Sequence, residues 1–164
     1  MRGIRGFFVF LFGMLAGMLI MQAAAAPQRS VTGLRLNHMG MYVKNFDESM
    51  NFYTKVMGFQ EAFSFKDKDG KPTLAYLQID HDTFLELAPA DAQHPVGFSH
   101  AGIWSDDVRE TVNTLRRKGV QVDDVHVGAT KAPLANVIDP NGLRLEILEY
   151  GPDSLQRKAI DSWK

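Results

Sequence analysis

The sequence predicts an α+β fold built from two tandem copies of a strand–helix–strand–strand–strand unit. The segment N-H-M-G-M-Y-V-K-N-F-D-E-S-M-N, from Asn37, aligns without gaps with S-H-A-G-I-W-S-D-D-V-R-E-T-V-N, from Ser99. In each copy the histidine lies in a strand-like segment that leads into a helical pattern. Each copy also ends in an apolar segment that contains one glutamate. These three observations indicate a duplicated module.

The aligned copies share both single residues and residue types. Their histidines, glycines, aromatic residues, glutamates and asparagines match in the pairs His38/His100, Gly40/Gly102, Tyr42/Trp104, Glu48/Glu110 and Asn51/Asn113. Self-similarity of this kind predicts that the two halves form the same structural unit.

The first copy begins with a strand over residues 36–43, where apolar and polar residues alternate. Asn45 or Asp47 can cap a helix that runs to about Met57, and Gly58 is suited to end it. Three further strands are predicted over residues 60–65, 73–79 and 83–87.

In the second copy a strand carries His100, and Asp106 or Asp107 can cap a helix that Gly119 ends. Three strands are then predicted over residues 122–127, 135–138 and 143–148. The D-P-N-G run at residues 139–142 is a strong turn between the last two. The resulting modules are residues 34–89 and 97–150 of a single 34–150 domain. The tail, residues 151–164, can form a short helix.

The N-terminus is typical of a secretory signal peptide. Arg2 and Arg5 precede an apolar run over residues 7–21, and four alanines follow at 23–26. We expect cleavage after Ala25, because a cut one residue later would place Pro27 first. Residues 1–25 are then a signal peptide, residues 26–33 are a linker, and the domain is periplasmic or secreted. An uncleaved segment would instead anchor the protein to the membrane.

Composition excludes several functions. The formal net charge is −1, which gives no reason to expect binding to nucleic acid. The chain has no cysteine, so it has no disulfide, no thiol nucleophile and no thiolate ligand for a metal. A metal would have to be held by nitrogen and oxygen atoms.

The candidate site consists of one histidine and one glutamate from each copy. Glu86 and Glu146 follow their histidines, His38 and His100, at nearly the same separation. A carboxylate within an apolar strand is costly to bury unless it is paired or bound to a metal. If a pseudo-twofold axis relates the halves, the four side chains can converge. Two imidazoles and two carboxylates suit Zn, Ni, Co, Mn or Fe(II).

The chain resembles the vicinal oxygen chelate superfamily, whose fold is a pair of βαβββ modules that form an open cup around a metal. The run H-M-G-M-Y-V-K-N-F-D-E-S-M-N-F-Y-T-K-V-M-G-F, from His38, resembles the glyoxalase I signature. The run D-P-N-G-L-R-L-E-I-L-E, from Asp139, resembles the family's C-terminal metal-ligand strand. The resemblance covers roughly residues 34–150.

The resemblance implies the metal ligands His38, Glu86, His100 and Glu146, the full set that glyoxalase I uses. It implies a metal-dependent lyase or isomerase in which a small substrate chelates the cation through neighbouring oxygens. Glu146 or Glu86 would act as the base. Short members of the family often dimerise and share sites, so a homodimer with shared sites is a further expectation.

Other functions of the same cup remain open. Glu86 can face the cup without being a ligand, which would leave a 2-His-1-carboxylate iron site and an extradiol-type dioxygenase. A third possibility is a non-catalytic module that binds a small molecule, as bleomycin-binding proteins do.

Several other residues are candidates for the pocket. Tyr42 and Trp104 lie four residues after their histidines and are either pocket walls or packing aromatics. Arg144 shares a strand face with Glu146, so it can pair with that carboxylate or hold an anionic substrate. His126 can face the cup or have a structural role, whereas His81 and His94 are expected in solvent.

Overall fold

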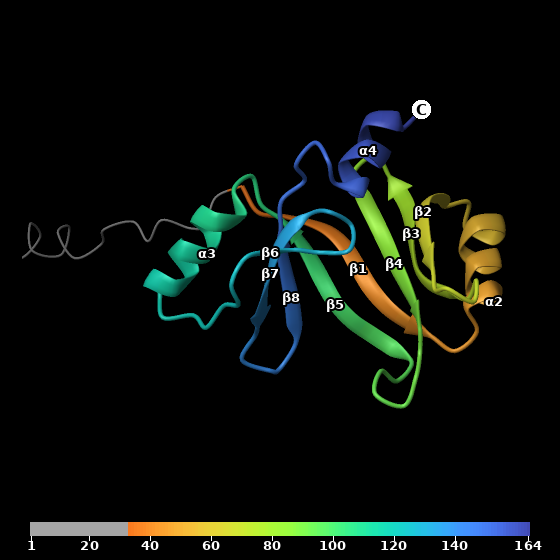
Figure 1. The fold of residues 1–164 in the computed structure, drawn as a ribbon, viewed down its shortest axis with the longest axis horizontal. Coiled ribbons are helices and arrows are strands. Elements are labelled where there is room, and N and C mark those ends of the chain that lie inside the picture. The colour runs from red at the N-terminus through yellow and green to blue at the C-terminus, as the bar shows by residue number, and fades with distance from the viewer. Residues whose placement is uncertain (1–32) are drawn as a thin grey trace, which may run out of the picture. The chain divides into compact units, whose positions relative to one another are not determined.

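The computed structural model describes residues 33–164, so the predicted signal peptide, residues 1–25, lies outside the described residues. The described chain forms one eight-stranded mixed sheet in the order β2-β3-β4-β1-β5-β8-β7-β6 (Figure 1). This confirms the predicted α+β class. Within residues 33–164, no helix is long and apolar enough to cross a membrane.

The first module contains strand β1 and a helical segment, followed by three strands. Its elements are β1 (Arg35–Val43), α2 (Phe46–Asn51), η1 (Phe52–Val56), β2 (Gln60–Lys66), β3 (Pro72–Asp80) and β4 (Thr83–Pro89). Of the two predicted caps, Asn45 caps α2, because its side chain accepts a hydrogen bond from the Glu48 N–H.

The predicted single helix of the first module continues as a π-helical turn, η1. The Met57 N–H donates to the Phe52 carbonyl at 3.0 Å, five residues back. The Thr54 hydroxyl also donates to the Met50 carbonyl at 2.7 Å, which competes with the regular α-helical bond.

The second module repeats the order of elements. They are β5 (Gly97–Trp104), α3 (Val108–Arg117), β6 (His126–Val127), β7 (Pro133–Ile138) and β8 (Arg144–Leu148), and the tail forms α4 (Leu155–Ser162). Asp107 caps α3 by accepting from the Glu110 N–H. The strand predicted over residues 122–127 is shorter than expected. The structure has one isolated bridge, Val122 to Val137, and the two-residue strand β6. The Arg116 side chain donates to the carbonyls of Val122 and Asp123, at the start of this segment.

Three apolar clusters hold the sheet. Under α2, Leu85 and Leu87 pack with Leu77, and under α3, Ile147 packs with Val108 and Val112. The third cluster joins α4 to the other face of the sheet and contains Tyr76, Phe84, Leu148, Tyr150 and Ile160. Period-two alternation explains this division, because neighbouring strand residues point to opposite faces. The face with Tyr76 and Phe84 is the one that carries the predicted site.

Candidate metal centre

The antiparallel pairing of β1 with β5 places the two histidines at the centre of the sheet. His38 lies opposite Gly102, and His100 lies opposite Gly40. Each imidazole lies across the backbone of the opposite glycine. A Cβ atom on Gly102 would lie 2.0 Å from His38 Cε1, and one on Gly40 would lie 2.3 Å from His100 Cε1. The two glycines of the repeat therefore make room for the rings.

The parallel neighbours of these strands carry the two glutamates. Glu86 of β4 is aligned with Gly40, and Glu146 of β8 is aligned with Gly102. Aligned residues of neighbouring strands point to the same face, so both carboxylates share the face of the imidazoles. The four side chains thus meet within one chain.

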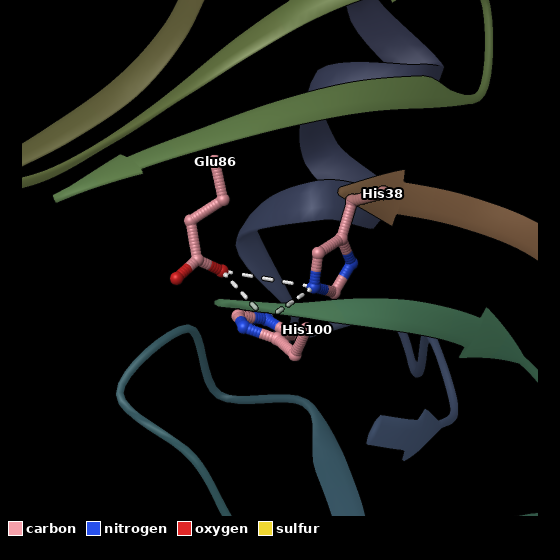
Figure 2. A group of neighbouring side chains, drawn as sticks. All are labelled: His38, Glu86 and His100. Atoms are coloured by element: carbon pink, nitrogen blue, oxygen red, sulfur yellow. Dashed lines mark hydrogen bonds and ion pairs between the residues drawn. The ribbon is translucent and has the colours of Figure 1, made fainter. Parts of the chain in front are cut away.

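The four donor groups are close to one another. His38 Nε2 and His100 Nε2 are 3.0 Å apart. Glu86 Oε2 lies 3.6 Å from the first and 3.5 Å from the second. Figure 2 shows the three side chains pointing toward one another. Glu146 Oε2 lies 3.7 Å from both. Both imidazoles are almost fully buried.

This spacing fits a single divalent cation. Nitrogen and oxygen ligands at 2.0–2.1 Å from one ion lie roughly 3.0–3.4 Å from each other. The donor distances of the centre are close to this range, and His38, Glu86 and His100 form its tightest group. The predicted cofactor therefore has a donor set here that can hold a divalent ion, and the chemistry of that set suits Zn, Ni, Co, Mn or Fe(II).

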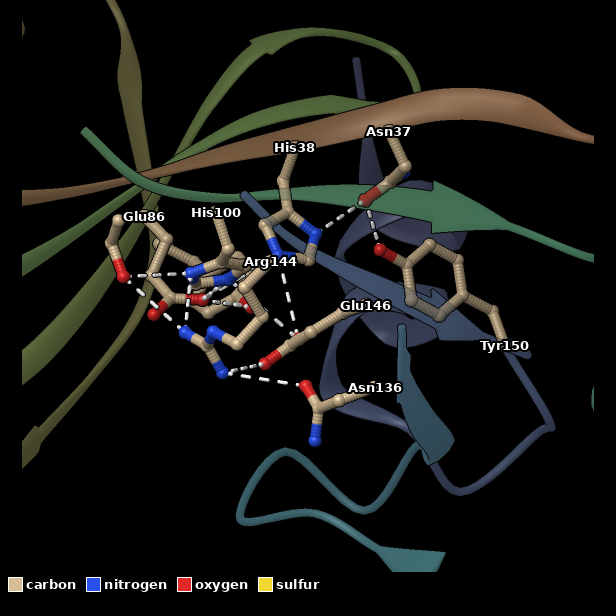
Figure 3. Close-up of polar contacts among 10 residues, drawn as sticks. Asn37, His38, Glu86, His100, Asn136, Arg144, Glu146 and Tyr150 are labelled. Carbon is tan, nitrogen blue, oxygen red and sulfur yellow. Dashed lines mark hydrogen bonds and ion pairs between the residues drawn. The ribbon is translucent and has the colours of Figure 1, made fainter. Parts of the chain in front are cut away.

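Asn37 orients His38. Its Oδ1 accepts from His38 Nδ1 at 3.3 Å and from the Tyr150 hydroxyl, and its Nδ2 donates to the Asp82 carbonyl at 2.6 Å (Figure 3). With the proton on Nδ1, the lone pair of Nε2 points to the centre. Burial, opposed by the charge of Glu86, lowers the pKa of His38 to about 4, so the ring is neutral at pH 7.

Tyr76 holds Glu86. Its hydroxyl donates to Glu86 Oε2 at 2.5 Å, and its ring packs edge-on against His38 at a centroid distance of 5.4 Å. Burial and the charge of Glu86 raise the pKa of Tyr76, so the phenol remains a donor. Burial also acts to raise the pKa of Glu86, but hydrogen bonds, chiefly from His100 and also from Tyr76, hold it below its usual value.

Arg144 contacts the other carboxylate. Its Nη1 lies 2.9 Å from Glu146 Oε1, so one of the two roles predicted for Arg144, the ion pair, is present. Its role toward an anionic substrate stays a prediction. Burial, reinforced by the charge of Glu86 and opposed by His100 and Arg144, raises the pKa of Glu146. The two glutamates are therefore in unequal environments.

The remaining candidates lie at the margin of the centre. The Tyr42 ring packs against that of His94 at 4.8 Å, and Trp104 packs against Tyr150 at 5.0 Å. Their role as pocket walls stays a prediction. His126 is exposed on β6.

Four contributing residues were not recognised in the sequence. Asn37 and Ser99 are aligned in the repeat, each directly before a histidine, and this position is a signal that could have identified both. Tyr76 is a single aromatic in an apolar strand, and Tyr150 follows the last strand, so neither has a pattern that indicates its contact.

Comparisons with known proteins identify the family and the fold. Residues 35–147 match the Glyoxalase/Bleomycin resistance protein/Dioxygenase superfamily. The chain is 28% identical over 124 residues to a probable lactoylglutathione lyase of Vibrio cholerae, covering 70% of this chain and 90% of that protein. It is 29% identical over 127 residues to a probable chloroplastic lactoylglutathione lyase of Arabidopsis thaliana, covering 72% of this chain but 36% of that protein. The structure of methylmalonyl-CoA epimerase from Mycobacterium tuberculosis shares the fold, with a TM-score of 0.61 and 22% identity over 74% of this chain and 90% of that one.

We expect Gly102→Ala to disrupt the centre, because its Cβ would overlap the His38 ring. The variant should lose at least about 2 kcal/mol of unfolding free energy in urea and bind Co(II) at least about tenfold more weakly. Gly151→Ala is the matched control, since nothing lies within 4 Å of a Cβ there. Wild-type stability and Co(II) affinity in Gly102→Ala would contradict the packing described.

We also expect the chelator-treated protein to lose stability as the pH falls from 6.5 to 4. A histidine whose folded pKa is about 4 binds fewer protons than the unfolded chain over this window, so folding is penalised there by at most about 3 kcal/mol. Urea unfolding at several pH values measures this effect. His38→Gln should reduce the slope, whereas His81→Gln, in an exposed turn, should keep it. An unchanged slope in His38→Gln would exclude His38 as its source.

Proposed function

The chain belongs to the Glyoxalase/Bleomycin resistance protein/Dioxygenase superfamily, and on this premise we propose that it is a metal-dependent lyase or isomerase. In the proposed reaction, a base removes a proton from a carbon next to a carbonyl group of a small oxygenated substrate. The observation that carries the proposal is the convergence of two imidazoles and two carboxylates within one chain.

His38, His100, Glu86 and Glu146 would hold the cation. Once bound, a divalent ion supplies Lewis-acid stabilisation of negative charge on neighbouring substrate oxygens. The residues around the centre support this role because Asn37 directs the lone pair of His38 inward and Tyr76 fixes Glu86. Buried Tyr76 and His38 also keep water away from this side of the centre.

Glu146 is the better candidate for the base. Glu86 is fixed by the short hydrogen bond from Tyr76, whereas Glu146 accepts from Arg144, whose side chain is 34% exposed. The pKa of Glu146 is raised and that of Glu86 is lowered, so Glu146 is the stronger proton acceptor. We therefore assign proton removal to Glu146 and a holding role to Glu86.

The substrate class follows from the chemistry shared by the relatives. The enzyme names lactoylglutathione lyase and methylmalonyl-CoA epimerase each contain the name of a thioester. Both thioesters have a hydrogen on the carbon next to the carbonyl group. We propose a small carbonyl compound of this kind for the present chain. Arg144 would meet an anionic group on it, because its partly exposed side chain places the guanidinium beside Glu146.

An Fe(II) extradiol-type dioxygenase is the second candidate. It is favoured by the group His38, Glu86 and His100, which by itself is a 2-His-1-carboxylate set. The carboxylate outside this group is Glu146 and not, as predicted, Glu86. This candidate requires oxygen, whereas proton removal does not. The two functions are therefore separated by working under argon.

We expect the protein loaded with Ni(II), Co(II) or Zn(II) to exchange the carbon-bound hydrogen of a substrate thioester for deuterium in D₂O under argon. Methylmalonyl-CoA and lactoylglutathione are the first probes, and mass spectrometry measures the exchange. Exchange should stop with a chelator and return with metal. Oxygen uptake with catechols, together with no exchange under argon, would favour the dioxygenase instead.

In the same assay Glu146→Gln should lower the exchange rate by at least about 100-fold, because an amide cannot accept the proton. Elemental analysis should still find metal in this variant, held by the other three ligands. Glu110→Gln, on the exposed surface of α3, is the control. Full activity in Glu146→Gln would remove Glu146 as the base.

We propose further that the enzyme is exported and works in the periplasm or outside the cell, as a homodimer. The support for export is the basic, apolar and alanine-rich order of residues 1–26. N-terminal sequencing of the protein from its native compartment should give a chain that begins at Ala26. A mature chain that begins at Met1 would contradict cleavage.

A further inference from the structure

Arg144 makes a second contact that concerns the metal centre directly. Its Nη2 lies 2.7 Å from His100 Nδ1 and 3.3 Å from Ser99 Oγ. The guanidinium and the imidazole lie side by side in Figure 3. Its Nη1 donates to Glu146 and lies 3.5 Å from Asn136 Oδ1. One guanidinium thus contacts both ligands that the second module contributes.

The direction of these hydrogen bonds fixes the tautomer of His100. A guanidinium can only donate, so His100 Nδ1 must accept, and the proton of the neutral ring is then on Nε2. Nε2 lies 3.0 Å from His38 Nε2, which can accept because the His38 proton is held on Nδ1 by Asn37. The chain of donors and acceptors is consistent from Arg144 through both rings to Asn37.

This arrangement excludes metal ligation by His100 Nε2. A ligand nitrogen needs its lone pair, so the proton must leave Nε2 for solvent while another is taken up on Nδ1, and the ring stays neutral. An Nδ1–H then faces the guanidinium donors, and Arg144 must move away. Ser99 Oγ, 3.0 Å from Nδ1, can accept the new N–H.

The first module has no equivalent of this contact. The residue aligned with His38 on β4 is Phe84, whereas the residue aligned with His100 on β8 is Arg144. Phe84 has no donor, so His38 keeps its lone pair directed inward. The opposition to metal ligation is therefore specific to His100.

We propose that Arg144 competes with the metal ion for the centre. As a positioning residue, it holds His100 in the tautomer that cannot ligate and neutralises Glu146, and metal binding displaces it. The inference rests on the metal centre of the proposed function. Exposure of 34% of the Arg144 side chain allows the displacement.

The test compares Arg144→Met with the wild type. Methionine has a similar length but no donor and no charge, so the variant should bind Co(II) about tenfold or more tightly, as measured by competition with a chromophoric chelator. Arg117→Met, which removes an exposed arginine on α3, should leave the affinity unchanged. Ser99→Ala should weaken Co(II) binding, because the ligating tautomer loses its acceptor.

Long-range ¹⁵N NMR of the chelator-treated protein gives an independent reading of the tautomer. His100 should carry its proton on Nε2 in the wild type, and the Nδ1–H form should increase in Arg144→Met and in Zn(II)-loaded protein. Equal or weaker Co(II) binding by Arg144→Met, or an Nδ1–H tautomer in the chelator-treated wild type, would overturn the inference. If the wild type binds Co(II) and Arg144→Met binds it no better, this inference alone fails. If neither binds, the metal centre of the proposed function fails as well.

Discussion

The antiparallel pairing of β1 with β5 determines where every donor of the centre lies. It places each histidine opposite a glycine of the other strand, and each parallel neighbour adds a glutamate beside that glycine. The backbone hydrogen bonds between these four strands fix their register and therefore the positions of the donors. No loop is needed to bring the donors together. A slip of one residue between β1 and β5 would turn one histidine to the opposite face.

The two halves have the same ligands but different surroundings. Tyr76 and Asn136 occupy equivalent positions beside the two glutamates, and Phe84 and Arg144 occupy equivalent positions beside the two histidines. The ligands of the first half therefore lie beside the neutral Tyr76 hydroxyl and the Phe84 ring. The ligands of the second half contact the Arg144 guanidinium. This difference divides the two glutamates into one that is fixed and one that can change partner. If the surrounding residues were the same in both halves, the two glutamates would have equivalent environments.

Much of the fold could be predicted because the repeat contains residues whose types indicate particular local structures. His38 and His100, with their matching glycines, locate the central strands, and Gly58 and Gly119 follow the helical segments as expected. The π-helical turn at η1 could not be predicted, since it depends on which carbonyl accepts from Met57. The short β6 was also missed, because an arginine from α3 takes the carbonyls that the strand pattern assigns to a sheet.

The same distinction holds for the site. The four donors could be predicted from residue type and spacing, because few kinds of side chain bind metals and each half of the duplication supplies one histidine and one glutamate. The contact of Arg144 with His100 joins side chains of two neighbouring strands, and no sequence pattern contains it. The contact of Asn37 with His38 was missed although Asn37 directly precedes the histidine and Ser99 has the same position in the second half.

Helix α4 decides from which side a molecule can approach. Ile160 packs with Tyr76, Phe84 and Tyr150, so the helix covers one flank of the donor face. The imidazoles are almost completely enclosed, whereas the side chains of Glu86 and Glu146 keep 15% and 14% of their surface in solvent. A compound that approaches the centre therefore meets the two carboxylates and the neighbouring guanidinium before the imidazoles. The charge of such a compound therefore interacts with Glu86, Glu146 and Arg144 before the compound can contact the buried ring nitrogens.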